Sequence, residues 1–292
     1  MDFRALLAGL VFALIWSSAF ASARIIVEAM PPLSALAIRF LISGLLGIAI
    51  AAALGQALRL APGQWRAVII FGLCQNALYL GLNFVAMQWV EASLAAIIAS
   101  TMPLLVAAAN WGLFREKLPV LGLAGLAAGF CGVGLIMVQR LGGGADGTGI
   151  VLCLIGAAAL TVATLAMRGA ATNGGNLMMV VGLQMLVGSA ALAPVALITE
   201  SWTVAWSLPL VVAFVYTTLM PGLVATLIWF WLVGRIGPTR AATFHFLNPV
   251  FGVAIAAALL GEGLSMIDAV GVAIVAAGIL AVQLARVKPT RS

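Results

Sequence analysis

Charged side chains are scarce in this sequence. They make up only 8% of its 292 residues, whereas hydrophobic residues make up 64%. The resulting mean hydropathy of +1.22 excludes an ordinary soluble globular domain, whose composition is much more polar. A lipid-facing exterior is the simplest explanation, and almost nothing remains from which to build a soluble domain.

Cysteine and histidine are also scarce. Cys74, Cys131 and Cys153 all lie inside apolar runs, without the paired spacing of a disulfide framework or a metal site. His245 is the single histidine, so we expect neither a metal centre nor any other cofactor.

Signatures of catalysis are missing too. No Gly-rich loop ends in Gly-Lys-Ser or Gly-Lys-Thr, so the sequence gives no sign of ATP hydrolysis. An intramembrane serine protease pairing a helix serine with His245 is an alternative of another class. It is disfavoured because no Gly-x-Ser-Gly occurs, and Ser265 follows Gly263-Leu264 at a helix junction without a glycine after it. We predict that the chain is not an enzyme.

Long apolar runs recur along the whole chain. About 20 apolar residues in a helix cross the hydrocarbon core, at a rise of about 1.5 Å per residue. We predict ten transmembrane helices and an all-α fold. The predicted spans lie at about residues 5–27, 32–54, 66–88, 92–113, 119–139, 148–170, 176–198, 207–233, 239–260 and 266–286.

Lysine and arginine are distributed unevenly between alternate loops of this ten-helix arrangement. Eleven of the fourteen fall on one side, Arg24 and Arg140 fall on the other, and Arg39 lies within a helix. Because cytoplasmic loops carry the excess of basic residues, we expect both termini in the cytoplasm. This topology, rather than nucleic-acid binding, accounts for the net charge of +6. A signal peptide ending near Ala19–Ala23 is an alternative for the first span. Its removal would leave one helix of the repeat described next without a counterpart.

The two halves of the chain are related. Placing Pro103 on Pro249 aligns further residues of the last two helices of each half: Glu116 with Glu262, Gly125 with Gly271, and Gly132 with Gly278. We therefore divide the chain into a five-helix repeat at about residues 1–140 and a second at about 148–286. An odd number of helices per repeat inverts the second copy in the membrane, so Glu116 and Glu262 face opposite compartments.

The sequence resembles the drug/metabolite transporter superfamily, and within it the ten-helix EamA-type exporters. The motifs that carry the resemblance are Trp16-Ser17-Ser18, Arg39-Phe40, Pro103 with Arg115-Glu116-Lys117-Leu118, and Pro249 with Gly261-Glu262-Gly263-Leu264. The resemblance covers nearly the whole chain and implies export by alternating access around a central cavity, with the fifth and tenth helices as scaffold. Within the superfamily the chain is most similar to amino-acid exporters, including those for aromatic amino acids. The motif residues Trp16 and Ser17 thereby become candidate substrate ligands.

Two prolines interrupt predicted helices. Proline lacks an N–H, so Pro103 frees the carbonyl of Ala99 and Pro249 frees that of His245. Such breaks need polar partners or a cavity. Polar residues stand beside both breaks: Ser100, Thr101, His245 and Asn248. They are candidate substrate ligands at the repeat interface, and the alternative is a packed kink relieved by hydroxyl groups.

Polar and aromatic residues also mark the third and eighth helices. Asn76, Tyr79 and Asn83 are spaced three and four apart, which predicts one shared face that lines a cavity or, alternatively, makes interhelical hydrogen bonds. In the eighth helix Pro221-Gly222 precedes Trp229-Phe230-Trp231. These rings either bind an apolar substrate group or form an interfacial belt near Arg235.

Arg39 is predicted to lie about 10 Å inside its helix. A guanidinium at that depth either attracts a substrate carboxylate or snorkels to the headgroups. Glu116 and Glu262 stand at helix junctions, where we expect capping or ion pairing. A strip of glycines on the fifth helix, Gly122, Gly125, Gly129 and Gly132, predicts a close helix contact, within the chain or between subunits.

These features favour a secondary carrier of small, neutral or zwitterionic molecules. Asp and Glu are absent from the middle of every predicted span, which disfavours cationic drugs. Nucleotide sugars and lipids remain alternatives, although larger anions call for more than one buried basic group. The expected partners are a small-molecule substrate and the lipid bilayer, without nucleic acid. The oligomeric state is open, with a monomer compatible, and titration of His245 leaves proton coupling open as well.

Overall fold

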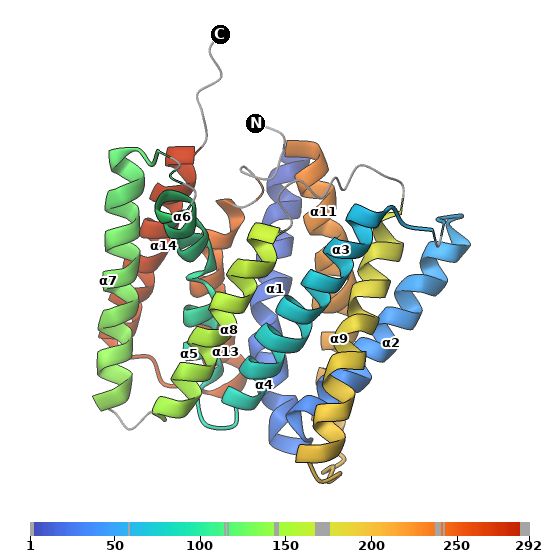
Figure 1. The fold of residues 1–292 in the computed structure, drawn as a ribbon. Coiled ribbons are helices and arrows are strands. Elements are labelled where there is room, and N and C mark those ends of the chain that lie inside the picture. The colour runs from blue at the N-terminus through green and yellow to red at the C-terminus, as the bar shows by residue number, and fades with distance from the viewer. Residues whose placement is uncertain are drawn as a thin grey trace. The chain divides into compact units, whose positions relative to one another are not determined.

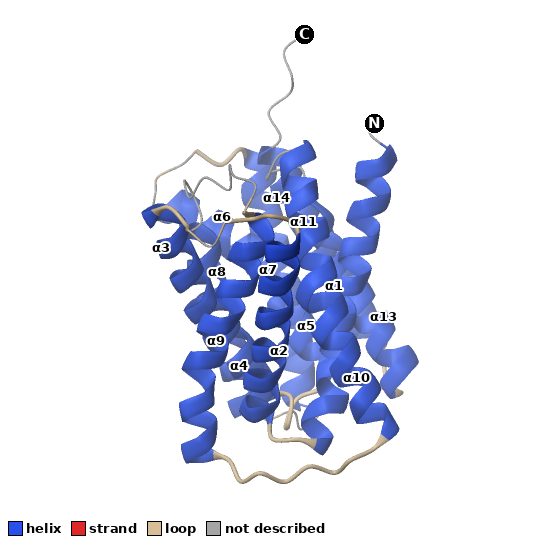
Figure 2. Ribbon diagram, turned by 90° about the vertical axis from the view of Figure 1, so that its right-hand side faces the viewer, coloured by secondary structure: helices blue, strands red, loops and turns tan. Residues whose placement is uncertain are grey.

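A computed structural model describes residues 3–57, 59–113, 115, 117–142, 146–166, 176–236, 241 and 243–286 of the chain. Glu116 lies outside these residues. Within them the regular structure is entirely helical, as Figure 2 shows.

Several predicted spans consist of two or three consecutive helical segments. The elements of the first half are α1 (Phe3–Ala29), α2 (Pro32–Ala53), α3 (Pro62–Phe71) with η1 (Gly72–Leu80) and α4 (Gly81–Ala86), α5 (Ala92–Ala99) with α6 (Met102–Gly112), and α7 (Val120–Gly142). Those of the second half are α8 (Gly147–Ala166), α9 (Leu177–Thr199), α10 (Leu208–Leu219) with η2 (Met220–Val224) and α11 (Ala225–Ile236), η3 (Thr243–Leu247) with α13 (Asn248–Leu260), and α14 (Met266–Arg286).

The prediction of ten membrane-spanning segments is confirmed. Over the described residues, 9 helices are long and apolar enough to cross a membrane, and a shorter apolar helix at Phe244–Leu260 is the tenth. Large hydrophobic side chains remain on their surfaces; Leu197 and Ile198, for example, are each 84% exposed. Such side chains are stable against lipid tails, which are as apolar as leucine itself.

The chain forms two compact units that each draw on both sequence repeats. Unit 1 comprises Met1–Ala21, Val90–Gly147 and Ile228–Ser292, and unit 2 comprises Ser22–Trp89 and Thr148–Leu227. The boundaries of the two sequence repeats therefore differ from those of the two compact units. Helices that correspond in the two repeats pack together inside one unit: α7 with α14 and α5 with α13 in unit 1, and α2 with α9 in unit 2.

The α7–α14 pair, side by side in Figure 1, is held together by glycines. A Cβ atom added to Gly125 would lie 2.8 Å from the carbonyl oxygen of Gly278, and one added to Gly132 would lie 3.0 Å from that of Gly271. Only glycine permits this approach of two backbones. The glycine strip thus makes the contact within the chain that was one of its two predicted roles.

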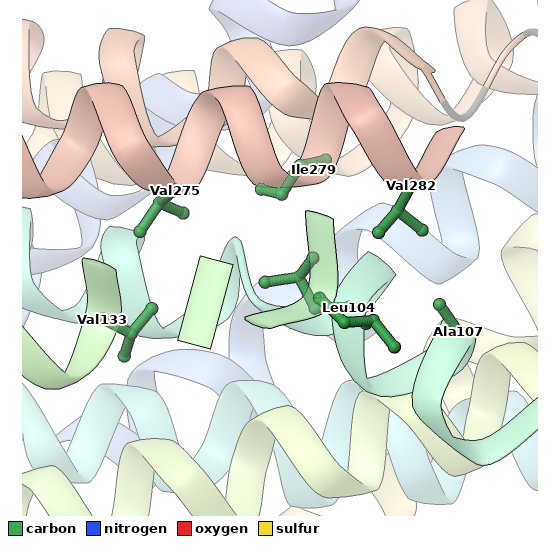
Figure 3. Packing of buried hydrophobic residues seen from close by; sticks show 7 residues of the cluster. Leu104, Ala107, Val133, Val275, Ile279 and Val282 are labelled. Carbon is green, nitrogen blue, oxygen red and sulfur yellow. The ribbon is translucent and has the colours of Figure 1, made fainter. Parts of the chain in front are cut away.

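Beside this contact lies a small apolar core that joins α6, α7 and α14. Its buried members are Leu104, Ala107, Leu126, Val133, Val275, Ile279 and Val282, most of which are labelled in Figure 3. Tight packing of these side chains fixes α6, α7 and α14 to one another.

Unit 2 repeats the same design with α2 and α9, neighbours in Figure 1. A Cβ atom on Gly182 would come within 2.9 Å of the carbonyl oxygen of Gly44, and one on Gly47 within 3.1 Å of the Gly182 Cα. Among the described residues, each unit therefore contains a helix pair in close backbone contact.

Glutamates cap the first turns of two helices. Glu262 accepts the backbone N–H groups of Ala92 and Ser93 at 2.7 and 2.9 Å, at the start of α5. Glu200 accepts those of Leu33 and Ser34, both at 2.8 Å, at the start of α2. A carboxylate at a helix N-terminus satisfies unpaired donors and complements the helix dipole. The expectation that Glu262 caps a helix junction agrees with this geometry.

Candidate functional site

Both predicted proline breaks are present in unit 1, at equivalent places. Pro103 is the second residue of α6, and Pro249 is the second residue of α13. Each proline occupies the first turn of a new helix, where its missing N–H costs least. The preceding helix ends at Ala99 in the first repeat, and a short 3-10 helix, η3, precedes the break in the second.

Ser100 and Thr101 form the join between α5 and α6. The Ser100 hydroxyl donates to the carbonyl of Ala96 at 2.6 Å, and the Thr101 hydroxyl donates to that of Ile98 at 2.6 Å. These bonds match the alternative of a kink relieved by hydroxyl groups. Both side chains are buried, and their role as substrate ligands stays a prediction.

An aromatic cluster surrounds the second break. Its rings come from Phe12 and Trp16 on α1, Trp229 on α11 and His245 on η3. The ring of His245 meets those of Trp229, Phe12 and Trp16 nearly edge-on, at centroid distances of 5.0, 5.4 and 6.4 Å. Phe12 also lies 5.1 Å from Trp229. Phe12 and His245 are buried, whereas Trp16 and Trp229 keep part of their surface free.

Polar groups lie directly beside these rings. The side-chain amide of Asn248 donates from Nδ2 to Nδ1 of His245 at 2.9 Å, an arrangement that places the ring proton on Nε2. Oδ1 of Asn248 is buried without a hydrogen-bond partner in the described structure. The hydroxyl of Ser17 approaches the backbone oxygen of Asn248 at 3.4 Å. The cluster thus combines aromatic surface with one free acceptor.

The two tryptophans of the aromatic run in the eighth span have different neighbours. Trp229 belongs to the aromatic cluster. Trp231 is exposed, and the guanidinium carbon of Arg235 lies over its ring, 5.2 Å from the ring centroid. The two tryptophans therefore have different surroundings, and both roles that the sequence suggested, an aromatic binding surface and an interfacial belt, stay predictions.

Unit 2 contains two π-helical stretches. Gly72–Leu80 interrupts the third span and Met220–Val224 the eighth, and the alignment of Pro103 with Pro249 places the second stretch on the middle of the first. Pro221 explains the second stretch, but we have no physical account of why the first is π-helical. π-Helical turns occur often at functional sites.

The α-helical spacing assumed for Asn76, Tyr79 and Asn83 is wrong, because η1 is π-helical up to Leu80. All three side chains are buried, yet their neighbours differ. Asn76 donates to the backbone oxygen of Gln184 on α9 at 3.0 Å, and Asn83 donates to that of Tyr79 at 2.8 Å. Asn76 makes the interhelical bond of the alternative interpretation, and substrate contact by the three residues stays a prediction.

Arg39 is buried in unit 2, with 5% of its surface exposed. Its Nε donates to the carbonyl of Thr217 at 3.2 Å. That oxygen is four residues before Pro221, which lacks the N–H that would otherwise bind it. One turn further along α2, Ser43 donates to the next carbonyl, of Thr218, at 3.2 Å. Arg39 and Ser43 therefore stabilise the interrupted end of α10.

Sequence reasoning missed some of these residues. Phe12 precedes Trp16 by one helical turn, and this spacing was a usable signal for a shared aromatic face. Thr217 could also have been predicted, because a proline at position 221 frees the backbone carbonyl four residues earlier. Asn110 on α6 is buried with both amide atoms unpartnered among the described residues, and only its polarity within an apolar span marks it.

The sequence was compared with known proteins. The profile of the EamA-like transporter family matches residues 3–138 and 147–284. The uncharacterized inner membrane transporter YedA of Escherichia coli K12 is 31% identical over 294 residues, covering 98% of this chain and 94% of YedA. The uncharacterized transporter YvbV of Bacillus subtilis is 28% identical over 237 residues, covering 81% of this chain and 77% of YvbV.

A solved crystal structure shares the fold. It superposes with a TM-score of 0.72 at 23% sequence identity, covering 97% of this chain and 98% of the other. At this identity the similarity establishes the architecture alone.

Proposed function

Because the chain belongs to the EamA-like transporter family, we propose that it is a secondary transporter that exports small metabolites, with neutral and aromatic amino acids as substrates. The chain is a multi-pass membrane protein, and its similarity to the inner membrane transporter YedA supports a place in the bacterial inner membrane. We propose no catalytic activity for it.

The aromatic cluster at the break before Pro249 carries the substrate assignment. Trp16 and Trp229 retain free ring surface, against which an apolar or aromatic side chain stacks favourably. The unpartnered Oδ1 of Asn248 is an acceptor for the ammonium group of an amino acid, which the neighbouring ring faces also attract.

The distribution of charge supports a zwitterion over the alternatives. In the part of the chain that is described, acidic residues stand at helix ends and in loops, where Glu200 and Glu262 are engaged in capping. A cationic drug would gain from a carboxylate inside the membrane. Arg39 is the one buried Lys or Arg among the described residues, and a nucleotide sugar calls for more.

Alternating access is the proposed mechanism, as the resemblance implies. Interrupted helices supply backbone that can change conformation without breaking a full helical ladder. The interruptions at Ser100–Thr101 and at η3 in unit 1, and at η1 and η2 in unit 2, are the segments for this movement. Direction follows the substrate and ion gradients, so export is the physiological expectation and not a property of the fold.

Transport by the purified protein in liposomes tests the proposal. We expect saturable uptake of labelled phenylalanine, tryptophan and leucine, and comparison with and without a proton gradient decides the coupling. Trp229→Ala should raise KM for aromatic substrates by about tenfold, because the variant loses a stacking partner. Trp231→Ala is the matched control, since this neighbouring tryptophan pairs with Arg235 outside the cluster.

Two results would count against this assignment. If none of the tested amino acids is taken up, the amino-acid assignment fails, and lipids, nucleotide sugars or cationic drugs become the candidate substrates. Equal effects of Trp229→Ala and Trp231→Ala would remove the aromatic cluster from the substrate site.

A further inference from the structure

Two exposed tryptophans lie close together in the loop between α9 and α10, which Figure 2 draws in tan. Trp202 is 61% exposed and Trp206 is 75% exposed. An indole ring combines a large apolar surface with a single N–H donor, so contact with an apolar partner is favourable for it. Two such rings in one short loop indicate a contact surface rather than a connection that is merely solvated.

The loop is attached to the ends of neighbouring helices in unit 2. The backbone N–H of Ala205 donates to the carbonyl of Ala29, the last residue of α1, at 2.8 Å. The hydroxyl of Ser207 accepts the backbone N–H of Leu210 in the first turn of α10 at 3.3 Å. At the other end of the loop, Glu200 caps the start of α2. Because these bonds order the loop, its tryptophans bind a partner at little cost in conformational entropy.

The loop borders the lipid-facing surface of unit 2. The 23 residues of α9 span about 34 Å, slightly more than the roughly 30 Å of a hydrocarbon core. Leu197 and Ile198 near the end of α9 and Leu208 at the start of α10 are strongly exposed, as side chains in contact with lipid tails are. The loop continues this surface just beyond the hydrocarbon, at the depth of the phospholipid headgroups.

The loop offers no positive charge to an anionic partner. Residues 200–207 contain neither lysine nor arginine, and Glu200 is their only charged residue. Both carboxylate oxygens of Glu200 already accept backbone N–H groups at the start of α2. Tryptophan, in contrast, is enriched where hydrocarbon meets water, because its ring is amphipathic. The composition of the loop therefore favours the neutral membrane interface over a partner recognised by charge.

We propose that Trp202 and Trp206 insert into the phospholipid headgroup layer on the side of the membrane where α1 ends, and that they bind the neutral interface rather than headgroup charge. Interfacial tryptophans help to set the depth and tilt of the helices that carry them. This pair therefore fixes α9 and α10 relative to the bilayer and, through Ala205, also the end of α1. The inference does not depend on which substrate the protein carries.

Tryptophan fluorescence in lipid nanodiscs tests the proposal, since both faces of a nanodisc are open to solution. The phosphatidylcholine carries bromine, a contact quencher, either near the headgroup or near the end of the acyl chain. The protein has 8 tryptophans, so the signal of the pair is the difference between the wild type and the double variant Trp202→Phe/Trp206→Phe. We expect bromine near the headgroup to quench this signal about twofold more than bromine near the chain end.

Trp16→Phe is the control, because Trp16 lies partly buried in the aromatic cluster of unit 1. Either brominated lipid should quench the signal lost in this variant less than the signal of the pair. Strong quenching of the pair by iodide in the water, without quenching by brominated lipid, would place the loop in solution and overturn the proposal. Protection from both quenchers would show that the rings contact protein, such as a second copy of this chain, and would also overturn it.

Lipid charge provides the second test. Replacing part of the phosphatidylcholine by anionic phosphatidylglycerol should leave the quenching of the pair unchanged, since the loop carries no basic residue. Quenching that rises with the anionic fraction would refute binding to the neutral interface.

Discussion

Arg140 at the end of α7 and Asp268 in the first turn of α14 form a paired ion bridge. Nε and Nη2 of Arg140 donate to the two carboxylate oxygens of Asp268 at 3.1 and 3.0 Å. Asp268 is only 2% exposed and also accepts the backbone N–H and the hydroxyl of Ser265. Glu91 contacts the other terminal nitrogen of Arg140 from an exposed position. Residues from three segments of unit 1 thus meet at one cation.

Asp268→Asn should destabilise the protein strongly. The change leaves Arg140 without its buried counter-charge, and removing one partner of such a pair costs about 3 kcal/mol. Glu91→Gln is the matched control at the same arginine and should cost about 0–1 kcal/mol, because Glu91 is largely solvated. Thermal unfolding of the detergent-solubilised variants measures both, and equal shifts would refute the dominance of the buried pair.

Glu262→Ala should weaken the start of α5. It removes both acceptors of the Ala92 and Ser93 N–H groups, a loss of about 1 kcal/mol for a helix cap. Glu262→Gln keeps one acceptor oxygen, so its melting temperature should lie between those of the wild type and the alanine variant. A glutamine variant as unstable as the alanine variant would show that charge, rather than capping, is what matters.

Gly125→Leu should separate α7 from α14. A side chain there collides with the backbone of Gly278, and overpacking of this kind costs about 2 kcal/mol. Gly134→Leu on the same helix is the control, since nothing lies within 4 Å of a Cβ at that position. The two variants are compared by melting temperature in detergent, and similar values would contradict the proposed role of the glycine contact.

Pro221→Ala should reduce transport with little loss of stability. The restored N–H competes with Arg39 for the carbonyl of Thr217 and favours a continuous helix. A shift in the orientation of Arg39 should lower uptake by about tenfold or more. Pro194→Ala, in the exposed part of the uninterrupted helix α9, should retain uptake. Unchanged uptake by Pro221→Ala would show that the interruption does not position Arg39.

Sequence reasoning located the spans well because lipid imposes a simple rule on length and composition. The tenth span was predicted at about 266–286 and α14 occupies Met266–Arg286; the fifth was placed at about 119–139 and α7 occupies Val120–Gly142. The breaks at Pro103 and Pro249 were predicted for a related reason, since proline acts on its own helix.

Features that depend on residues far apart in the sequence could not be predicted from local sequence patterns. The π-helical turns of Gly72–Leu80 contain no proline, so nothing in that stretch predicted them. Glu200 gave no sign of capping α2, because its partners are 166 and 167 residues away. The aromatic cluster was found only in part, since Phe12 looked like one apolar residue among many.

The contact between α7 and α14 has a consequence for biosynthesis. A helix inserted early lacks its glycine contact until its partner is made, and here the partner α14 lies at the far end of the second repeat. The same delay applies to α2, whose contact surface is completed only by α9 from the other half. The nascent first half therefore has no finished scaffold of its own, and assembly of either unit must await insertion of the second half.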